Sequence, residues 1–248
     1  MTTEQREAIV AFEMTLFTAQ VFDAEAGHLS ARHARGGPEY LSSQPFYFGI
    51  NDVVSGDYKT GAAFNPTAFN LYESWRAKAD GGGDDQGRNA ARAAVARGEI
   101  LFNSRPIQIT DVKGLNDDLG IEMLPGTCTT CHDTPTSGNH SIPAPLDIGL
   151  TDAKRRTSDM PLYTLRNKQN PELVVQTTGP GRALISGKWR DIGRFKGPIL
   201  RGLAARAPYF HNGFAKDLDA AVDFYNERFG LGLTDAEHDD LVAFLLTL

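Results

Sequence analysis

This sequence of 248 residues has only two cysteines, no long hydrophobic run and no excess of positive charge. Because no run approaches the ~18–20 apolar residues of a membrane-spanning helix, we expect no transmembrane segment. The 25 basic and 31 acidic residues give a net charge of −6 without a basic stripe, which argues against nucleic acid as a partner. Hydrophobic residues at 41% and charged residues at 23% are ordinary globular usage, so general disorder and fibrous structure are excluded.

The two cysteines, Cys128 and Cys131, are three positions apart, and His132 follows directly. Such a pair can be a redox dithiol, half a zinc site or a disulfide. No second Cys-x-x-Cys completes a zinc site, and no strand–helix pattern of the thioredoxin kind surrounds the motif. The remaining interpretation is Cys-x-x-Cys-His, the attachment signature of c-type haem. We therefore expect one covalent haem c, with a metal site or redox dithiol as the lesser alternative.

Helical spacing of apolar residues predicts helices along the chain. One spans residues 3–22, and an alanine-rich one spans residues 88–103, with Gly98 and Phe102 on the same face. A glycine four residues before an aromatic lets a second helix cross closely over it. The segment Thr234-Asp-Ala-Glu237 is a capping-box pattern and predicts the start of a hydrophobic terminal helix.

A glycine-rich linker is predicted at residues 81–87, since glycine has the largest backbone entropy. It divides the chain into an N-terminal helical and irregular extension, residues 1–80, and a haem domain, residues 88–248. Within the extension, residues 23–70 are expected to be ordered loop, with a short helix at 66–78.

The order of the predicted elements in the haem domain is an amphipathic helix, a haem-attachment loop and a hydrophobic terminal helix. This order is similar to class I cytochromes c, whose first and last helices cross beside the haem. We therefore expect a mainly α fold, namely a cytochrome c-like helical domain with long irregular loops and an N-terminal helical extension.

Three later segments are more specific: DIGRFKGPILRG at 191–202, APYFHNG at 207–213 and LDAAVDFY at 218–225. They resemble the C-terminal haem domain of bacterial dihaem cytochrome c peroxidases and their relatives, which include dihaem enzymes that mature a tryptophan-derived quinone. That family has two Cys-x-x-Cys-His motifs, whereas this chain has one. The resemblance implies a haem that exchanges electrons with a second haem domain or with a small donor or acceptor protein.

The resemblance favours electron transfer within a peroxidase-like oxidoreductase, because in the family peroxide is reduced at the other haem. The alternative is an enzyme whose own haem activates peroxide or oxygen, which needs an acid–base residue such as His211 beside the oxidant. Haem c is attached outside the bacterial cytoplasm in such families, which implies a periplasmic or otherwise exported protein. Residues 1–6 have no apolar core of a secretory signal, so we expect the signal to have been removed or to lie outside this sequence.

His132 is the expected proximal iron ligand. The first candidate for the distal ligand, on the other side of the iron, is Tyr225, which lies on the apolar face of a helix. The resemblance implies a ligand here, because the peroxidases have a methionine and the quinone-forming enzymes a tyrosine at this place. A half-buried core tyrosine is the plainer interpretation. Met160 is the second, because a Met-Pro pair is frequent at the thioether ligand of small cytochromes c, although such a residue is more often gap-filling core or loop. His211 is the third. The distal ligand decides the reduction potential and whether small molecules reach the iron.

Arg166 and Arg201 are candidates for pairing haem propionates, because a guanidinium fork matches a carboxylate. Ordinary surface arginines are the plainer interpretation of each. Trp189 is expected to pack in the core or against the haem. Relatives hold calcium partly through backbone carbonyls, which the resemblance would place around Arg206 and Pro208 here.

Overall fold

The computed structural model describes residues 1–13, 18–43, 51–53, 55–57, 60–76, 86–138 and 144–248. Its α-helices are α1 (Thr3–Glu13), α2 (Pro38–Ser42), α3 (Gln86–Ser104), α4 (Asn116–Leu119), α5 (Ala183–Ser186), α6 (Leu218–Phe229) and α7 (Asp235–Leu245). Its strands are β1 (Phe22–Asp23), β2 (Gly27–His28), β3 (Ile107–Thr110), β4 (Met123–Gly126), β5 (Tyr163–Arg166) and β6 (Val174–Thr177). Single turns of 3-10 helix lie at Ala31–His33, Glu73–Trp75, Cys128–Thr130, Ala153–Arg155, Trp189–Asp191 and Leu203–Ala205.

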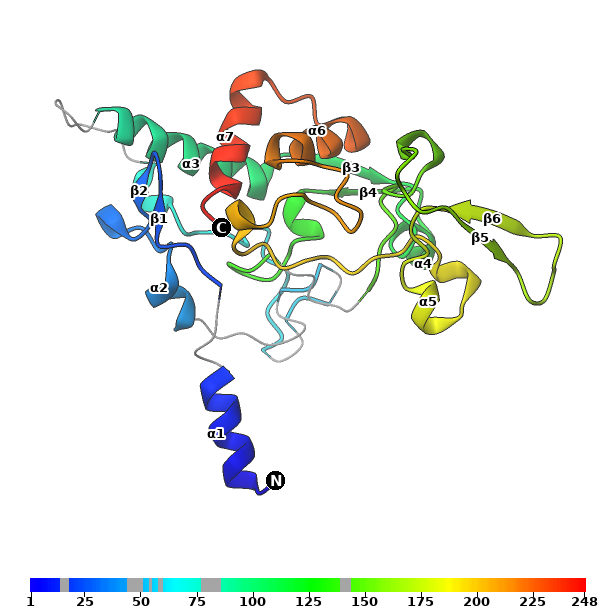
Figure 1. The fold of residues 1–248 in the computed structure, drawn as a ribbon. Helices are drawn as coiled ribbons and strands as arrows, with labels where there is room; N and C mark the ends of the chain where they lie inside the picture. The colour runs from blue at the N-terminus through cyan, green and yellow to red at the C-terminus, as the bar shows by residue number, and fades with distance from the viewer. Residues whose placement is uncertain (14–17, 44–50, 54, 58–59, 77–85, 139–143) are drawn as a thin grey trace.

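The main packing contact of the fold is the crossing of α3 and α7 (Figure 1). A Cβ atom on Gly98 would run into the carbonyl oxygen of Asp240 and the side chain of Phe244, so only glycine permits this approach. Across the crossing, Arg97 and Asp240 form an ion pair at 2.6 Å. The close crossing at Gly98 and the Thr234–Glu237 capping box are confirmed.

The crossing is surrounded by a large hydrophobic cluster, which we call the helix-crossing core. Its buried members are Ala26, Leu29, Ala34, Ala68, Phe69, Leu71, Tyr72, Trp75, Val95, Ala96, Phe102, Leu200, Leu203, Leu218, Val222, Leu241, Val242, Phe244, Leu245 and Leu248. Side chains of α3 also fix the segment at 69–72: Asn103 exchanges two hydrogen bonds with the backbone of Phe69, and the Glu99 carboxylate accepts the backbone N–H groups of Leu71 and Tyr72. The N-terminal residues therefore share one core with α3 and α7.

A second, smaller cluster lies beside the β3–β4 hairpin, and we call it the motif cluster. Its buried members are Ile107, Ile109, Val112, Leu115, Leu146 and Leu231, and Leu124, Cys128, Cys131, Ile148, Tyr225, Phe229 and Leu233 pack against it. Antiparallel pairing places Ile107 opposite Gly126 and Ile109 opposite Leu124. The hairpin therefore leads directly into the cysteine motif.

The expectation of a mainly α, cytochrome c-like fold is wrong. Helix accounts for only 38% of the structure and strand for 13%, in three separate two-stranded sheets of the described residues. The sequence hid these sheets because no strand is longer than four residues, which is too short for a period-two pattern to stand out. Long irregular segments with single helical turns join the helices instead.

Two expected helices are shorter in the structure than predicted, and the described end of the expected linker is helical. The helix expected at 3–22 is α1, which ends at Glu13; residues 14–17 lie outside the described residues, and Phe22 pairs with His28 in a short sheet. The expected helix at 66–78 is one 3-10 turn at Glu73–Trp75 in its described part. Of the expected linker, residues 81–85 lie outside the described residues, and the rest already belongs to α3.

Candidate haem site

The cysteine motif forms a single turn that the sequence itself caps. Cys128–Thr130 is a 3-10 turn in which Thr127 and Thr130 form a reciprocal capping box. The backbone N–H of His132 donates to the Cys128 carbonyl at 3.0 Å. This turn brings both sulfurs and the imidazole together within five residues.

The turn is anchored to the N-terminal part of the chain. The Thr129 hydroxyl donates to the Pro66 carbonyl at 2.8 Å, and the backbone N–H of Thr136 donates to the Ala68 carbonyl at 2.8 Å. The side-chain amide of Asn51 donates to the Asp133 carbonyl at 2.9 Å. These contacts hold both ends of the motif against residues 51–68.

The His132 ring is oriented by a backbone carbonyl. Its Nδ1 lies 2.9 Å from the carbonyl oxygen of Gly138. Because a carbonyl only accepts, Nδ1 carries the proton and Nε2 is the basic nitrogen. In metal-binding histidines, a hydrogen bond from the ring nitrogen that does not bind the metal fixes the tautomer in this way.

The two thiols are neutral at ordinary pH. Burial raises the pKa of Cys128 to about 12. Burial also raises the pKa of Cys131 to about 12, and the neighbouring Asp133 carboxylate adds to this shift. A catalytic dithiol needs a lowered cysteine pKa. Within the part of the chain that the structure describes, no group of three or more His, Cys, Asp or Glu side chains is placed to hold a metal ion.

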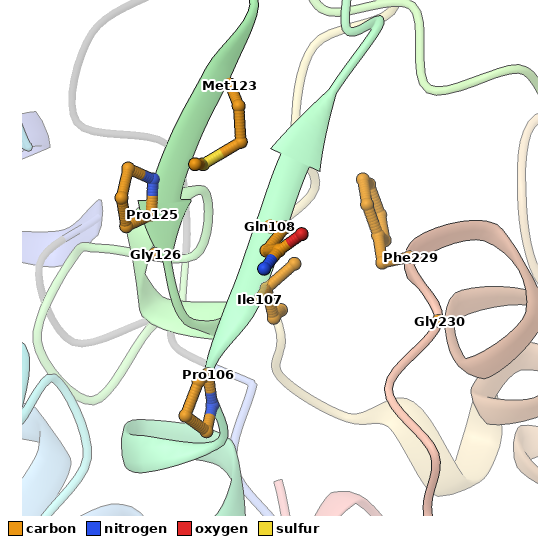
Figure 2. A pocket seen from close by; sticks show the side chains of 8 residues that line it. All are labelled: Pro106, Ile107, Gln108, Met123, Pro125, Gly126, Phe229 and Gly230. Atoms are coloured by element: carbon orange, nitrogen blue, oxygen red, sulfur yellow. The ribbon is translucent and has the colours of Figure 1, made fainter.

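A cavity of about 500 Å³ adjoins the motif (Figure 2). Ile107, Gln108, Met123 and Pro125 of the β3–β4 hairpin line one side, and Phe229 at the end of α6 lines the other. Gly126, two residues before Cys128, forms part of its wall. Cys128 and Cys131 do not line this cavity; they pack against the motif cluster, which gives the sulfurs an apolar surrounding.

Tyr225 is the distal candidate that the structure brings to the motif. Its ring centroid lies 6.5 Å from that of His132, with the rings nearly perpendicular. Phe210, Phe224 and Phe229 surround it at centroid distances of 6.0, 5.3 and 6.2 Å. Burial raises the pKa of its hydroxyl well above the usual value, and the nearby Cys131 and Cys128 raise it further.

Met160 lies close to Asn212, the residue after His211. The side-chain amide of Asn212, next to His211, lies 3.9 Å from the Met160 sulfur. The His211 ring stacks on Phe195 at a centroid distance of 3.9 Å, and burial lowers its pKa. No contact shown among the described residues joins Met160 or His211 to the cysteine motif.

The two propionate candidates differ in their surroundings. Arg166 is exposed on β5 and donates to the Pro171 carbonyl at 2.6 Å. Arg201 is only 4% exposed, and its Nη2 has no hydrogen-bond partner among the described residues. Burial lowers its pKa to about 10. A buried guanidinium nitrogen without a partner is costly, so it marks a place where an anion belongs.

Arg201 lies close to the segment that orients His132. The backbone N–H of the preceding Leu200 donates to the Ser137 carbonyl at 2.8 Å, and the Leu200 side chain packs on Gly138.

Trp189 is 36% exposed on its 3-10 turn. At the place expected for calcium, Arg206 donates to the Ile199 carbonyl at 3.2 Å, and the Ala207–Pro208 peptide is cis.

Sequence reasoning missed the residues that position the motif. Gly138, Asn51 and Pro66 act through backbone carbonyls or a side-chain amide, which have no sequence signature. Phe229, at the end of α6, lines the cavity, and no motif in the sequence marks it.

Comparison with known proteins gives relatives of a single kind. The cytochrome-c peroxidase IdrP1 of Denitromonas iodatirespirans is 43% identical over 237 residues, 85% of this chain and 54% of the relative. The cytochrome-c peroxidase IdrP2 of the same organism is 34% identical over 133 residues, 50% of this chain and 36% of the relative. IdrP1 of Pseudomonas sp. (strain SCT) is 25% identical over 231 residues.

No protein-family model and no solved structure matches this chain. The chain spans about half the length of the IdrP1 relatives and 36% of IdrP2. The motif, the cavity and these similarities agree: the homologues of this chain are bacterial cytochrome-c peroxidases.

Proposed function

We propose that the chain binds one haem c covalently through Cys128 and Cys131, with His132 as the fixed iron ligand. We further propose that it transfers electrons within a cytochrome-c-peroxidase-like oxidoreductase. The observation that carries the proposal is the capped Cys128–His132 turn, with Nδ1 of His132 directed at the Gly138 carbonyl. The homologues named cytochrome-c peroxidase support the same chemistry.

When bound, haem supplies an iron that changes between its ferrous and ferric states. The chain's own residues do the rest. Cys128 and Cys131 anchor the group, Gly138 sets the basic nitrogen of His132, and the motif cluster excludes water from one face. Arg201 is our candidate for holding a propionate, because its Nη2 is buried without a partner among the described residues. Arg166 is a weaker candidate, since it is exposed and already bonded.

Electron transfer fits the surroundings of Tyr225 better than activation of peroxide by this haem. The rings of Phe210, Phe224 and Phe229 around Tyr225 offer no general acid or base. We therefore propose Tyr225 as the distal ligand, with Met160 as the alternative. The partner would be a small electron-transfer protein or a second haem domain, at a periplasmic or otherwise exported location. The proposal includes no calcium step.

The first experiment is a haem stain of the denatured chain, made in cells that can attach haem c. We expect the wild type to retain haem through denaturation. Cys128→Ala should weaken retention, and Cys128→Ala/Cys131→Ala should abolish it. A wild-type chain that keeps no haem, or binds zinc instead, would refute the proposal.

The second experiment identifies the distal ligand from visible and EPR spectra of the ferric protein. Tyr225→Phe should change the spectrum, whereas Tyr209→Phe, a half-buried tyrosine that donates to the Leu203 carbonyl at 2.6 Å, should not. A charge-transfer band of thioether ligation that disappears only in Met160→Leu would instead assign Met160. If neither variant changes the spectrum, this haem has an open site and peroxide activation becomes the better hypothesis.

A further inference from the structure

One end of the molecule carries exposed aliphatic side chains in a basic surrounding. We call residues 162–199 the basic lobe; it contains β5, β6, α5 and the 3-10 turn at Trp189–Asp191. Figure 1 shows the β5–β6 hairpin and α5 at the end of the molecule opposite β1 and β2. The lobe is separate from the cysteine motif in sequence, and Arg166, the weaker propionate candidate, is its only residue with a role in the function proposed above.

The charge of the basic lobe is opposite to that of the rest of the chain. It has seven basic and two acidic residues, a net charge of +5, whereas the rest has 18 basic and 29 acidic residues, a net charge of −11. The exposed basic residues are Arg166, Lys168, Arg182, Lys188, Arg190 and Lys196. Of the two acidic residues, Asp191 is buried and lies 3.5 Å from Arg182. The surface of the lobe is therefore strongly positive.

The most exposed large aliphatic side chains of the lobe sit on its shortest helix. Leu184 is 72% and Ile185 91% exposed on α5. The base of this helix is fixed, because the backbone N–H of Arg182 donates to the Arg194 carbonyl at 2.9 Å. The helix ends at Gly187, which is left-handed with φ 65°. Leu184 and Ile185 are therefore held outward by a rigid turn.

The β5–β6 hairpin and the 3-10 turn of the lobe carry further exposed apolar groups. Leu162, Tyr163, Leu173 and Val174 of the hairpin are 44–50% exposed, and Trp189 is 36% exposed. Register places Val174 directly opposite Arg166, so an apolar and a basic side chain lie side by side on one face of the hairpin. Tryptophan, tyrosine and long basic side chains are the types that gather at a membrane–water interface.

A lipid layer is a better binding partner for these exposed aliphatic and basic side chains than a protein surface is. A specific protein interface needs a broad, complementary patch of roughly 800 Å² on each partner. Projecting aliphatic tips between basic side chains need no such complementarity, because a fluid layer of anionic headgroups adapts to them. No helix in the described part of the chain is long and apolar enough to cross a membrane, so the contact would be peripheral.

We propose that the basic lobe docks on anionic membranes, with Leu184 and Ile185 inserted between the headgroups and Arg182, Lys188 and Arg190 against the lipid phosphates. The acidic remainder of the chain is repelled by the same surface. The lobe therefore fixes the orientation of the molecule on the bilayer.

The test is sedimentation of the haem-loaded chain with phosphatidylcholine vesicles that contain one quarter phosphatidylglycerol, at low and high salt. We expect binding at low salt and release at high salt. Leu184→Ser/Ile185→Ser should lower the partition coefficient about tenfold or more. Arg182→Gln/Lys188→Gln/Arg190→Gln should lower it about 100-fold.

The matched control is Ile9→Ser/Val10→Ser on α1, whose side chains are 47% and 50% exposed but not in a basic surrounding. This variant should bind like the wild type. Equal binding to pure phosphatidylcholine, or lobe variants that bind like the wild type, would overturn the proposal. So would a wild-type dimer that Leu184→Ser/Ile185→Ser converts to a monomer. An unchanged haem spectrum in each variant separates these outcomes from failure of the proposed function.

Discussion

The helix-crossing core and the motif cluster differ in how completely their side chains are buried and paired within the chain. In the core, the buried Glu99 and Asn103 side chains are matched by backbone groups of residues 69–72. Cys128, Cys131 and Tyr225, which pack against the motif cluster, are only partly buried, and a cavity of about 500 Å³ lies beside Gly126. The comparison separates a scaffold that the chain completes alone from a site built to receive something.

The largest expected effect tests the scaffold. Gly98→Ala places a methyl group against the Asp240 carbonyl, so α3 and α7 must separate. We expect the free energy of unfolding to fall by about 3 kcal/mol or more, measured by urea denaturation. The control is Gly87→Ala on the same helix, where a Cβ meets nothing within 4 Å. This substitution should raise the free energy of unfolding, by no more than about 1 kcal/mol. Equal effects at the two positions would refute the tight crossing.

The next effect separates the two clusters directly. In the haem-free Cys128→Ala/Cys131→Ala chain, amide exchange in β3 and β4 should speed up by about tenfold or more, since ~1.4 kcal/mol of protection is a factor of ten. Exchange in α7 should change much less, because the helix-crossing core needs no haem. Hydrogen exchange followed by mass spectrometry measures both regions in one sample. Loss of protection in both regions to the same extent would make the two clusters one cooperative unit.

A smaller effect is expected at the boundary between the clusters, where Arg201 lies. Removing its positive charge in Arg201→Gln should lower the reduction potential of the haem, because a nearby cation favours the reduced iron. A shift of roughly 60 mV corresponds to about 1.4 kcal/mol for one electron. Redox titration of this variant beside Arg206→Gln, whose side chain is exposed, measures the difference. Equal potentials in the two variants would exclude Arg201 as a propionate partner.

The smallest effect concerns pH. Burial raises the pKa of Glu99 above its ordinary value of 4.5, so the folded chain binds this proton more tightly than the unfolded chain does. The contribution of Glu99 to stability is therefore largest in acid and decreases as pH rises through and above the ordinary value. Glu99→Gln should remove this dependence above about pH 4.5, whereas Glu73→Gln, an exposed partner of the same Arg76, should keep it. Parallel pH profiles of unfolding free energy for the wild type and Glu99→Gln would contradict the shift.

Local chemistry explains what the sequence could predict. The Cys128–His132 motif, the capping box at Thr234 and the glycine of the helix crossing each depend on residues within five positions of one another. The short sheets could not be predicted, because strands of two to four residues are held by their partners rather than by their own pattern. The sequence could not predict that Arg201 is buried and Arg166 exposed, because burial depends on the whole fold.

The sequence by itself predicted the attachment motif and determined where α3, α6 and α7 form, because both follow from neighbouring residues. Tertiary structure alone decided which carbonyl orients His132, that Tyr225 rather than Met160 or His211 comes to the motif, and that the lobe at 162–199 stays exposed. Those outcomes depend on contacts between residues far apart in the chain. They also depend on which polar groups are buried and which of these find a hydrogen-bond partner, and only the folded molecule decides that.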